Sequence, residues 1–275
     1  MSMRGMGMLR NGGLKLVTAA TFLFAAPAAN AALIGVSTSN SGVYSIDPAT
    51  GAATLLSTLD GVSSIAGASF LDGQLYVSDV YKSGAFSTVA ADPLTGATTV
   101  VSDQEGSTTW AALASSEADG VLYAVDAFDG NRLKSITPSA DVTAIGSGMN
   151  IFVAGMAYDD LNGILYAATA NALYTIDTAT GAASLIGALG FNSPLLGLAY
   201  DEDSQTLYAN AGNLGALFVI DVTSGLGTFV GLNGAALIDG LAWVSDAAIP
   251  LPAALPLFLA GAAGLGFARK RRRRA

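Results

Sequence analysis

A short segment recurs along this chain at a regular spacing. Residues 43–52, Val-Tyr-Ser-Ile-Asp-Pro-Ala-Thr-Gly-Ala, return in closely similar form at residues 173–182 and 217–225. Weaker copies lie at residues 92–97 and 133–143, so the shared Asp position recurs with a period of about 44 residues. Such a period is typical of folds in which one unit of supersecondary structure is repeated side by side, each copy packing on the next.

Each period predicts four short strands, which we name a, b, c and d in chain order. In the clearest copy these are residues 195–200, 207–210, 217–221 and 227–231, which are rich in Val, Ile, Leu, Tyr and Thr. The Asp-x-x-Thr-Gly segment between c and d predicts a hairpin turn, because its carboxylate accepts backbone N–H groups and its Gly supplies a positive φ. We therefore interpret the repeated aspartates as turn formers rather than ligands.

The copies of the four strands predict a closed ring. Five of each are present if residues 33–38 are taken as the first b strand, which leaves the first unit without an a strand. The missing strand stands at residues 239–244, and its pairing with the first unit would remove the open edges of the array. The sequence thus predicts an all-β fold, a five-bladed β-propeller of four-stranded antiparallel blades. A β-solenoid, the alternative, does not explain the split first unit.

Two aligned positions support this count of blades. The a strands place small residues nearest the expected axis, namely Gly67, Ala112, Gly155, Gly197 and Gly240. The b strands place an aromatic residue at one position, namely Tyr76, Tyr123, Tyr166 and Tyr208, which we interpret as packing residues. In these features most of residues 32–244 resembles the YVTN-type propeller repeats, which imply an architecture and no particular activity.

The N-terminus predicts export. Three basic residues precede an apolar run at residues 16–26, and Ala29 and Ala31 fit the small-x-small pattern that signal peptidase cleaves. We expect residues 1–31 to be a signal peptide and the mature chain to begin directly after them.

The C-terminus predicts sorting at a membrane. Pro250, Leu251 and Pro252 open an uncharged segment that runs to residue 268. A basic block follows, made of Arg269, Lys270, Arg271, Arg272, Arg273 and Arg274. This arrangement resembles the PEP-CTERM sorting tail of Gram-negative bacteria, with Leu251 where the usual motif has Glu. The resemblance covers residues 247–275 and implies a short transmembrane helix that an exosortase recognises and removes.

That resemblance also implies a route through the cell. The chain would sit transiently in the inner membrane with its basic block in the cytoplasm, and then reach the cell surface or the extracellular space. A permanent single-pass anchor is the alternative.

The expected propeller domain, residues 32–246, is strongly acidic. Of the 12 basic residues in the chain, three lie before residue 32 and six lie in the basic block, which leaves three against 21 acidic residues, a net charge of −18. Such a surface repels phosphate backbones, so we expect no nucleic-acid partner.

The absence of His and Cys narrows the chemistry further. Without these residues the chain cannot build a Ser-His-Asp or Cys-His catalytic set, a disulfide framework, or a typical zinc or copper site. Asp and Glu remain as the groups for acid–base chemistry. We expect no cofactor, although acidic clusters at residues 159–160 and 201–203 offer oxygen ligands for Ca²⁺ without the EF-hand spacing.

The topology sorts the acids between two faces of the ring. The a–b face carries the loops that join a to b and c to d, with fourteen acids, most of which we interpret as solvated turn residues. The d–a face carries the other loops, which are longer and less repetitive, and we expect any ligand there. The candidates on it are Asp239, Asp103, Glu105, Asp126, Asp129, Arg132 and Trp110. Asp239 alone places a carboxylate near the mouth of the axis, although it could equally cap a backbone N–H at the start of its strand.

These features predict an exported surface or matrix protein without catalytic activity. Its propeller would be a binding or structural module, with an exopolysaccharide or another surface component as partner. The alternative is an extracellular enzyme of a glycosidase-like or cyclase-like kind that uses Asp239, Asp126 and Asp103 on the d–a face.

Overall fold

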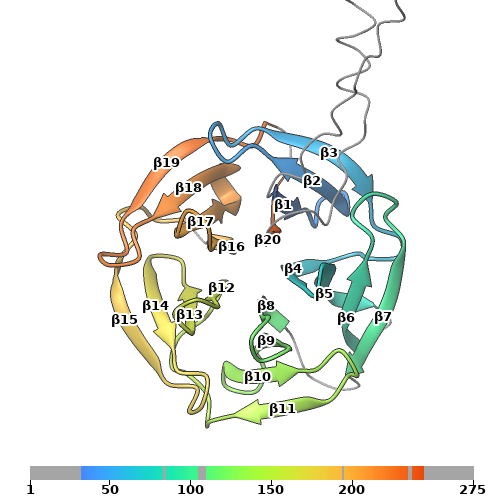
Figure 1. Ribbon diagram of the computed structural model, residues 1–275, viewed down its shortest axis with the longest axis horizontal. Coiled ribbons are helices and arrows are strands. Elements are labelled where there is room, and N and C mark those ends of the chain that lie inside the picture. The colour runs from blue at the N-terminus through green and yellow to red at the C-terminus, as the bar shows by residue number, and fades with distance from the viewer. Residues whose placement is uncertain (1–31, 83–84, 105–109, 194, 235–236, 245–275) are drawn as a thin grey trace, which may run out of the picture.

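The computed structural model describes residues 32–82, 85–104, 110–193, 195–234 and 237–244. Within them, twenty strands form five four-stranded antiparallel sheets arranged as the blades of a ring around a central axis (Figure 1). The predicted five-bladed propeller is confirmed. The expected signal peptide, the sorting tail with its Pro motif and basic block, and Glu105 lie outside the described residues. In the part that the structure describes, no helix has the length and apolar character needed to cross a membrane.

Within each blade, the strands are given in order from the axis outward. Blade 1 contains β20 (Gly240–Val244), β1 (Ala32–Val36), β2 (Gly42–Ile46) and β3 (Ala53–Thr58). Blade 2 contains β4 (Ile65–Leu71), β5 (Gln74–Lys82), β6 (Ala85–Ala91) and β7 (Thr98–Gln104). Blade 3 contains β8 (Trp110–Ser116), β9 (Val121–Asp126), β10 (Arg132–Ile136) and β11 (Val142–Ile145). Blade 4 contains β12 (Gly155–Asp159), β13 (Ile164–Ala168), β14 (Ala172–Ile176) and β15 (Ala183–Ala188). Blade 5 contains β16 (Leu195–Asp201), β17 (Thr206–Ala211), β18 (Ala216–Ile220) and β19 (Gly227–Leu232), with the 3-10 turn η1 (Gly212–Leu214) between β17 and β18.

The ring closes through the first blade. β20 pairs antiparallel with β1 from Ala32 opposite Val244 to Val36 opposite Gly240. The N–H of Asp239 extends this ladder by donating to the carbonyl of Val36 at 2.8 Å. The split first blade is therefore confirmed, and both ends of the described domain lie on the a–b face.

The axis is packed by backbone rather than by large side chains. A Cβ on Gly67 would lie 2.6 Å from the backbone nitrogen of Leu113, and one on Gly197 would lie 2.5 Å from that of Leu241. Along the inner strands, the space between these positions does not admit a water molecule. The prediction that small residues line the axis is confirmed, because neighbouring inner strands approach too closely for a larger side chain.

The b-strand tyrosines pack between blades. Tyr76, Tyr123, Tyr166 and Tyr208 are all buried. The rings of three of them pair with an aromatic ring on the inner strand of the next blade, as Tyr123 with Tyr158, Tyr166 with Tyr200, and Tyr208 with Trp243, at 5.7 to 5.8 Å between centroids. These contacts confirm the predicted packing role and join blade 3 to blade 4, blade 4 to blade 5, and blade 5 to blade 1.

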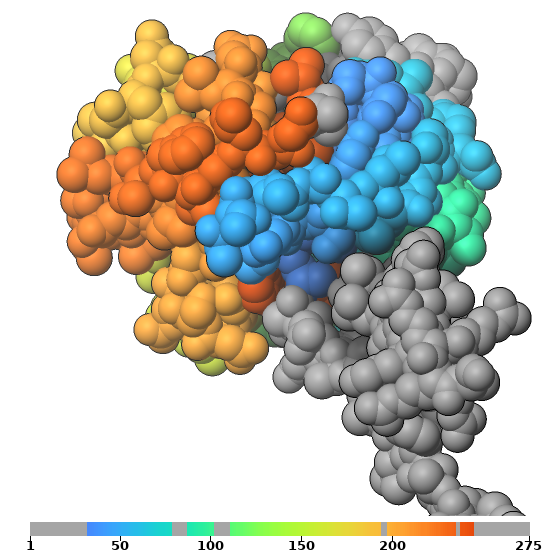
Figure 2. All heavy atoms as spheres, turned by 90° about the horizontal axis from the view of Figure 1, so that it is seen from above, coloured from blue at the N-terminus to red at the C-terminus, as the bar shows by residue number. Residues whose placement is uncertain are grey.

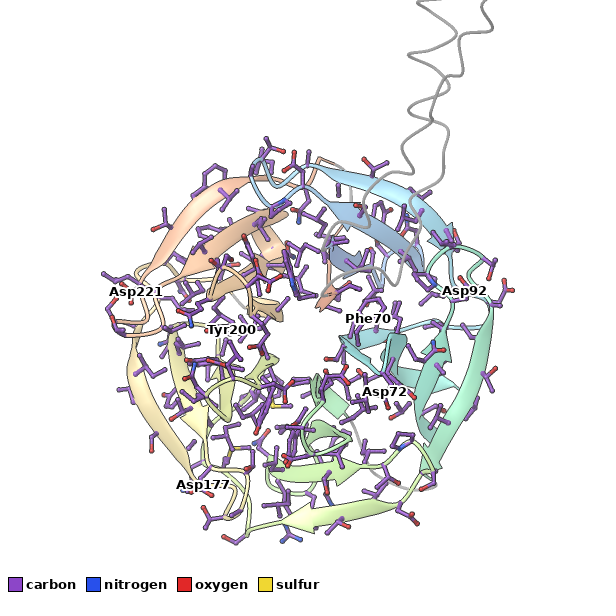
Figure 3. All side chains as sticks on the ribbon, in the orientation of Figure 1. Phe70, Asp72, Asp92, Asp177, Tyr200 and Asp221 are labelled. Carbon is purple, nitrogen blue, oxygen red and sulfur yellow. The ribbon has the colours of Figure 1, made fainter. Side chains whose placement is uncertain are left out.

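The c–d turns form as their sequence predicts. The Asp47 carboxylate accepts the N–H of Ala49 at 2.8 Å, and this bond lowers the pKa of Asp47. Gly51 has a φ of 75° and also packs closely on the next outer strand, because a Cβ there would lie 2.8 Å from the carbonyl carbon of Gly231. The same carboxylate-to-backbone bonds recur at the outer rim in Asp92, Asp177 and Asp221 (Figure 3).

Candidate functional site

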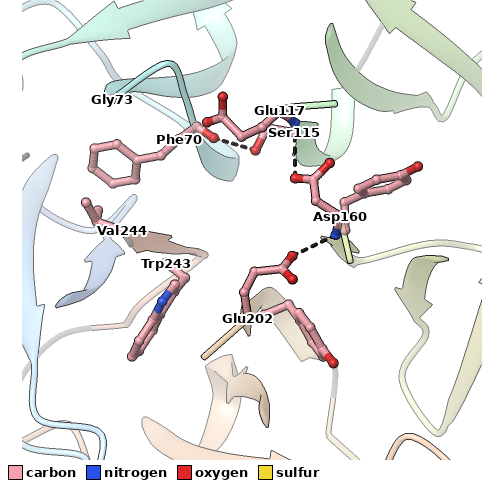
Figure 4. Close-up of a pocket in the computed structure, with 10 residues that line it drawn as sticks. Phe70, Gly73, Ser115, Glu117, Asp160, Glu202, Trp243 and Val244 are labelled. Atoms are coloured by element: carbon pink, nitrogen blue, oxygen red, sulfur yellow. Dashed lines mark hydrogen bonds between the residues drawn. The ribbon is translucent and has the colours of Figure 1, made fainter. Parts of the chain in front are cut away.

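A small hollow of about 110 Å³ lies on the a–b face where the five inner strands end around the axis (Figure 4). It is lined by Phe70, Gly73, Ser115, Glu117, Tyr158, Asp160, Tyr200, Glu202, Trp243 and Val244. Figure 3 shows that Phe70 and Tyr200 lie beside the axis, far from the turn aspartates at the rim. The hollow is on the face opposite to the one on which the sequence predicts a ligand.

The lining residues come from two repeated positions of the chain. In four blades an acidic residue directly follows the inner strand. These residues are Asp72, Glu117, Asp160 and Glu202. Two residues earlier stand the aromatic or small residues Phe70, Ser115, Tyr158 and Tyr200, with Trp243 in blade 1. Because the inner strands end side by side, the two repeated positions become two rings around the axis.

The acidic side chains connect one blade to the next. Glu202 accepts the N–H of Asp160 at 2.6 Å and that of Leu161 at 3.3 Å. Asp160 accepts the N–H of Glu117 at 3.1 Å and the hydroxyl of Ser116 at 3.0 Å. Two of these bonds are drawn in Figure 4.

The same relationship continues into blade 2. Glu117 accepts the N–H of Asp72 through both carboxylate oxygens, at 2.9 and 3.1 Å. Each of these three carboxylates therefore caps the a–b turn of the preceding blade. We name this set of bonds the carboxylate relay. It runs through Glu202, Asp160 and Glu117 and ends on the backbone of Asp72.

Burial and mutual repulsion shift the protonation of two members of the relay. Burial raises the pKa of Glu117, and the nearby charges of Asp72 and Asp160 add to this effect, while the N–H of Asp72 opposes it. Burial likewise raises the pKa of Glu202, with further contributions from Asp159 and Asp160. The hollow thus holds two carboxyl groups that take up a proton more readily than ordinary glutamates do.

The aromatic side chains around the hollow do not offer the faces of their rings to a ligand. Figure 4 shows the rings of Phe70 and Trp243 pointing away from the centre of the hollow. Tyr158 and Tyr200 stack on the tyrosines of the preceding blades. In blade 3 the position is filled by Ser115, whose hydroxyl bonds to the carbonyl of Phe70 and to the hydroxyl of Ser69. The carboxylates of Glu117, Asp160 and Glu202 complete the lining.

The two clusters that offer Ca²⁺ ligands in sequence are divided by the fold. Asp159 and Asp201 are buried, and each caps its own turn, with Asp159 accepting from the backbone and side chain of Asn162 at 3.0 and 2.8 Å. The Asp201 carboxylate accepts the N–H of Asp203 at 3.0 Å. Their sequence neighbours Asp160 and Glu202 point across to another blade instead. Among the described residues no three acidic side chains converge to form a metal site.

On the d–a face, Asp239 has the capping role. Its carboxylate accepts the N–H of Thr38 at 2.6 Å, and burial raises its pKa although this bond opposes the shift. Thr38 in turn bonds through its hydroxyl to the backbone of Ile65 at 2.9 and 3.0 Å, which ties blade 1 to blade 2. The carboxylate of Asp239 thus caps a backbone N–H, that of Thr38 in the turn after β1.

Three other candidates come together in the b–c turn of blade 3. Asp129 lies 2.8 Å from the ammonium of Lys134 and 3.4 Å from the guanidinium of Arg132, and the hydrogen bond from Lys134 lowers its pKa. Asp126 is 1% exposed, accepts the N–H of Phe128 at 3.1 Å and lies 3.7 Å from Lys134. Lys134 joins two of the predicted acids, and it is two residues from Arg132 on the same strand.

The remaining candidates occupy different parts of the ring. Trp110 begins β8 with its backbone opposite Asp126, whereas Asp103 lies on the outermost strand of blade 2, opposite Ser87. Asp239 precedes the innermost strand of blade 1. Asp126 and Asp103 thus belong to strands of different blades, and Asp239 to the loop before β20, so the backbones of the three residues lie at different distances from the axis.

Sequence analysis placed Glu117, Asp160 and Glu202 on the correct face but interpreted them as solvated turn residues. Their recurrence at one position of the repeat, together with Asp72, does not distinguish them, because the aspartates of the c–d turns also recur in register and cap their own turns.

No family model matches the chain, and no curated protein matches it in sequence. Among solved structures, a chain in the crystal structure of a nidogen/laminin complex has a TM-score of 0.56 at 12% identity, over 78% of this chain and 99% of that chain. A protein of unknown function from Bacteroides thetaiotaomicron has a TM-score of 0.50 at 15% identity, over 75% of this chain and 66% of its own. At these identities the likeness shows the propeller fold alone.

Proposed function

We propose that this chain is an exported protein of the cell surface or extracellular matrix whose propeller is a binding or structural module without catalytic activity. The observation that carries the proposal is the pairing of Ala32 with Val244. The expected signal peptide and the expected sorting tail would both join the domain at one place on its a–b face. Removal of either segment would leave the ring intact.

The proposed route has two processing steps. Signal peptidase would cleave after Ala31, and an exosortase would recognise Pro250, Leu251 and Pro252. Until then the segment that ends in Arg269 to Arg274 would hold the chain in the inner membrane, with its charges in the cytoplasm.

The chemistry of the hollow favours a structural role over catalysis. Its carboxylates are engaged as caps for backbone N–H groups of neighbouring blades. Its volume of about 110 Å³ is below the roughly 300 to 1,000 Å³ of pockets that enclose small-molecule ligands. We therefore assign binding to the broad outer surfaces, with an exopolysaccharide or another surface component as partner. A similar chain occurs in a nidogen/laminin complex, which is compatible with a role in binding.

The test is cell fractionation with mass spectrometry of both mature termini. We expect an N-terminus at Ala32, and a C-terminus upstream of Arg269 in the surface or extracellular fraction. A chain that keeps its first 31 residues, or one found in the cytoplasm, would refute the export that the proposal requires. A mature form that keeps the basic block in the membrane would support the permanent anchor instead.

One observation favours a second candidate function, an extracellular carboxylate enzyme. Glu117 and Glu202 line one hollow and both have a raised pKa, as a general acid requires. A panel of glycans and other hydrolase substrates would test it. Turnover that is lost in Glu202→Gln and kept in Asp239→Asn would establish the enzyme, whereas saturable binding without turnover would support the binding module.

A further inference from the structure

The outer wall of the ring carries large apolar side chains that face solvent. They lie on or beside the outermost strands of blades 4, 5 and 1: Leu185 (64% exposed), Leu226 (55%), Phe229 (56%), Leu232 (63%) and Leu55 (53%). The corresponding positions of the other two blades hold Val100, which is 40% exposed, and the small Ala144. The apolar side chains are therefore concentrated on one side of the ring.

These strands form one wall because their blades contact each other closely at the rim. A Cβ on Gly225 of blade 5 would lie 2.7 Å from the carbonyl oxygen of Gly187 at the end of β15. Gly51 of blade 1 approaches Gly231 at the end of β19 in the same way. Figure 2 views part of this wall, with β19 in orange beside β3 in blue. We name β15, β19 and β3, with Leu226, the apolar wall.

The apolar wall carries no charge. β3, β15 and β19 contain no Asp, Glu, Lys, Arg or Pro. Exposed edge strands commonly carry Lys or Pro, which prevent contact with other chains. The lack of both in a domain with a net charge of −18 marks this wall as a surface that is covered by a partner.

We propose that the partner is a second copy of this chain, packed wall against wall. Two domains of such high negative charge repel each other over most of their surfaces, whereas the strands of the apolar wall carry no charge, and the acids beside them are those of the c–d turns, Asp47, Asp177 and Asp221. The position of the wall relative to the chain ends also suits such a contact. Both chain ends leave from the a–b face, so copies held by their tails at one surface would stand side by side, with outer walls facing. This last step rests on the proposed function.

The shape of the strands limits the contact to pairs. β19 has a bulge at Val230 against β18, since Leu217 pairs with Gly231 and Phe218 with Phe229. β3 and β15 are bulged against their neighbours in the same way. A bulged edge cannot extend a regular backbone ladder into a fibre, so the contact is made by side chains, and a twofold arrangement closes it.

Photo-crosslinking of the full chain in the cells that produce it tests the proposal. A photoreactive benzophenone amino acid would replace Phe229. In a matched control it would replace Phe152, an aromatic residue outside the apolar wall that is somewhat more exposed (64% against 56%). We expect a product of twice the chain mass from position 229 and none from position 152, with mass spectrometry locating the linked peptide in β3, β15 or β19. No product, equal products from both positions, or a product with another protein would overturn the proposal.

A charge variant gives a second measurement. Phe229→Lys should abolish the doubled mass in sedimentation of the purified full chain, whereas Phe152→Lys should retain it, both with thermal unfolding close to the parent. Unchanged sedimentation of Phe229→Lys would count against the wall. The location of the chain is read separately by fractionation, so a monomer at the cell surface refutes the pairing alone. A dimer in the cytoplasm refutes the export alone.

Discussion

The carboxylate of Glu202 on blade 5 lies 2.6 Å from the backbone nitrogen of Asp160 on blade 4. The relationship repeats from Asp160 to Glu117 and from Glu117 to Asp72, so three carboxylates join four consecutive blades. Propeller blades are usually regarded as joined by apolar packing, which this chain also has between its tyrosines. The carboxylate relay adds directional bonds on the a–b face, where both ends of the described domain lie.

Removal of one carboxylate should loosen a blade junction. Glu202→Ala takes away the acceptor for the N–H groups of Asp160 and Leu161, which by analogy with helix caps costs about 1 to 2 kcal/mol. We expect the melting temperature to fall by about 2 to 8 °C for a domain of this size. Asp203→Ala, at an exposed acid of the same turn, is the matched control and should change it by less than half as much. Equal effects of both variants would show that the relay contributes nothing specific.

The raised pKa of two relay members gives the fold a defined pH dependence. A carboxyl whose pKa is higher in the folded than in the unfolded state favours folding when protonated. Its stabilising contribution is therefore complete below the unfolded value, near 4.5, and is lost as the pH rises through the folded value. Relative to a Glu117→Gln, Glu202→Gln double variant, the parent should gain melting temperature as the pH falls from 7 to about 4.5. Parallel curves for the two proteins would show that these groups do not titrate differently on folding.

Replacement of a glycine at the axis should lower the free energy of unfolding through steric contact alone. Gly197→Ala places a Cβ 2.5 Å from the backbone nitrogen of Leu241 without requiring a positive φ, so neighbouring inner strands must separate. We expect a loss of about 1 to 3 kcal/mol, as for overpacked cores. Gly120→Ala is the control, because nothing lies within 4 Å of its Cβ and only its φ of 65° is unfavourable, which costs about 1 kcal/mol. Denaturant unfolding would rank the two, and a larger loss at Gly120 would contradict the packing described for the axis.

Deletion of residues 32–42 tests the closure of the ring. This removes β1, which lies between β20 and β2, and leaves two exposed strand edges. We expect aggregation or a large fall in melting temperature, whereas removal of Asn213 and Leu214 from the η1 turn should have a small effect. If the first deletion unfolded at the parental temperature, β1 would contribute nothing to the closure of the ring.

The repeat made the fold predictable because it fixes both the strands and their number. The spacing of Asp47, Asp177 and Asp221 marks the c–d turns, and the surplus a strand at residues 239–244 predicts how the ends meet. The site was less predictable. Asp159 and Asp160 are consecutive and chemically alike, yet one caps its own turn and the other bonds to the preceding blade. Only the relative position of neighbouring blades decides between these roles, and that position is not encoded in any local pattern.

The meeting of Ala32 and Val244 also has a mechanical consequence. Tension applied to the chain beyond Val244 and directed along β20 acts parallel to the ladder with β1, at all five paired positions together. Hydrogen bonds loaded in shear resist far more force than bonds that open one after another, because they must break at once. A domain pulled at this end would therefore hold its ring until the whole ladder slips.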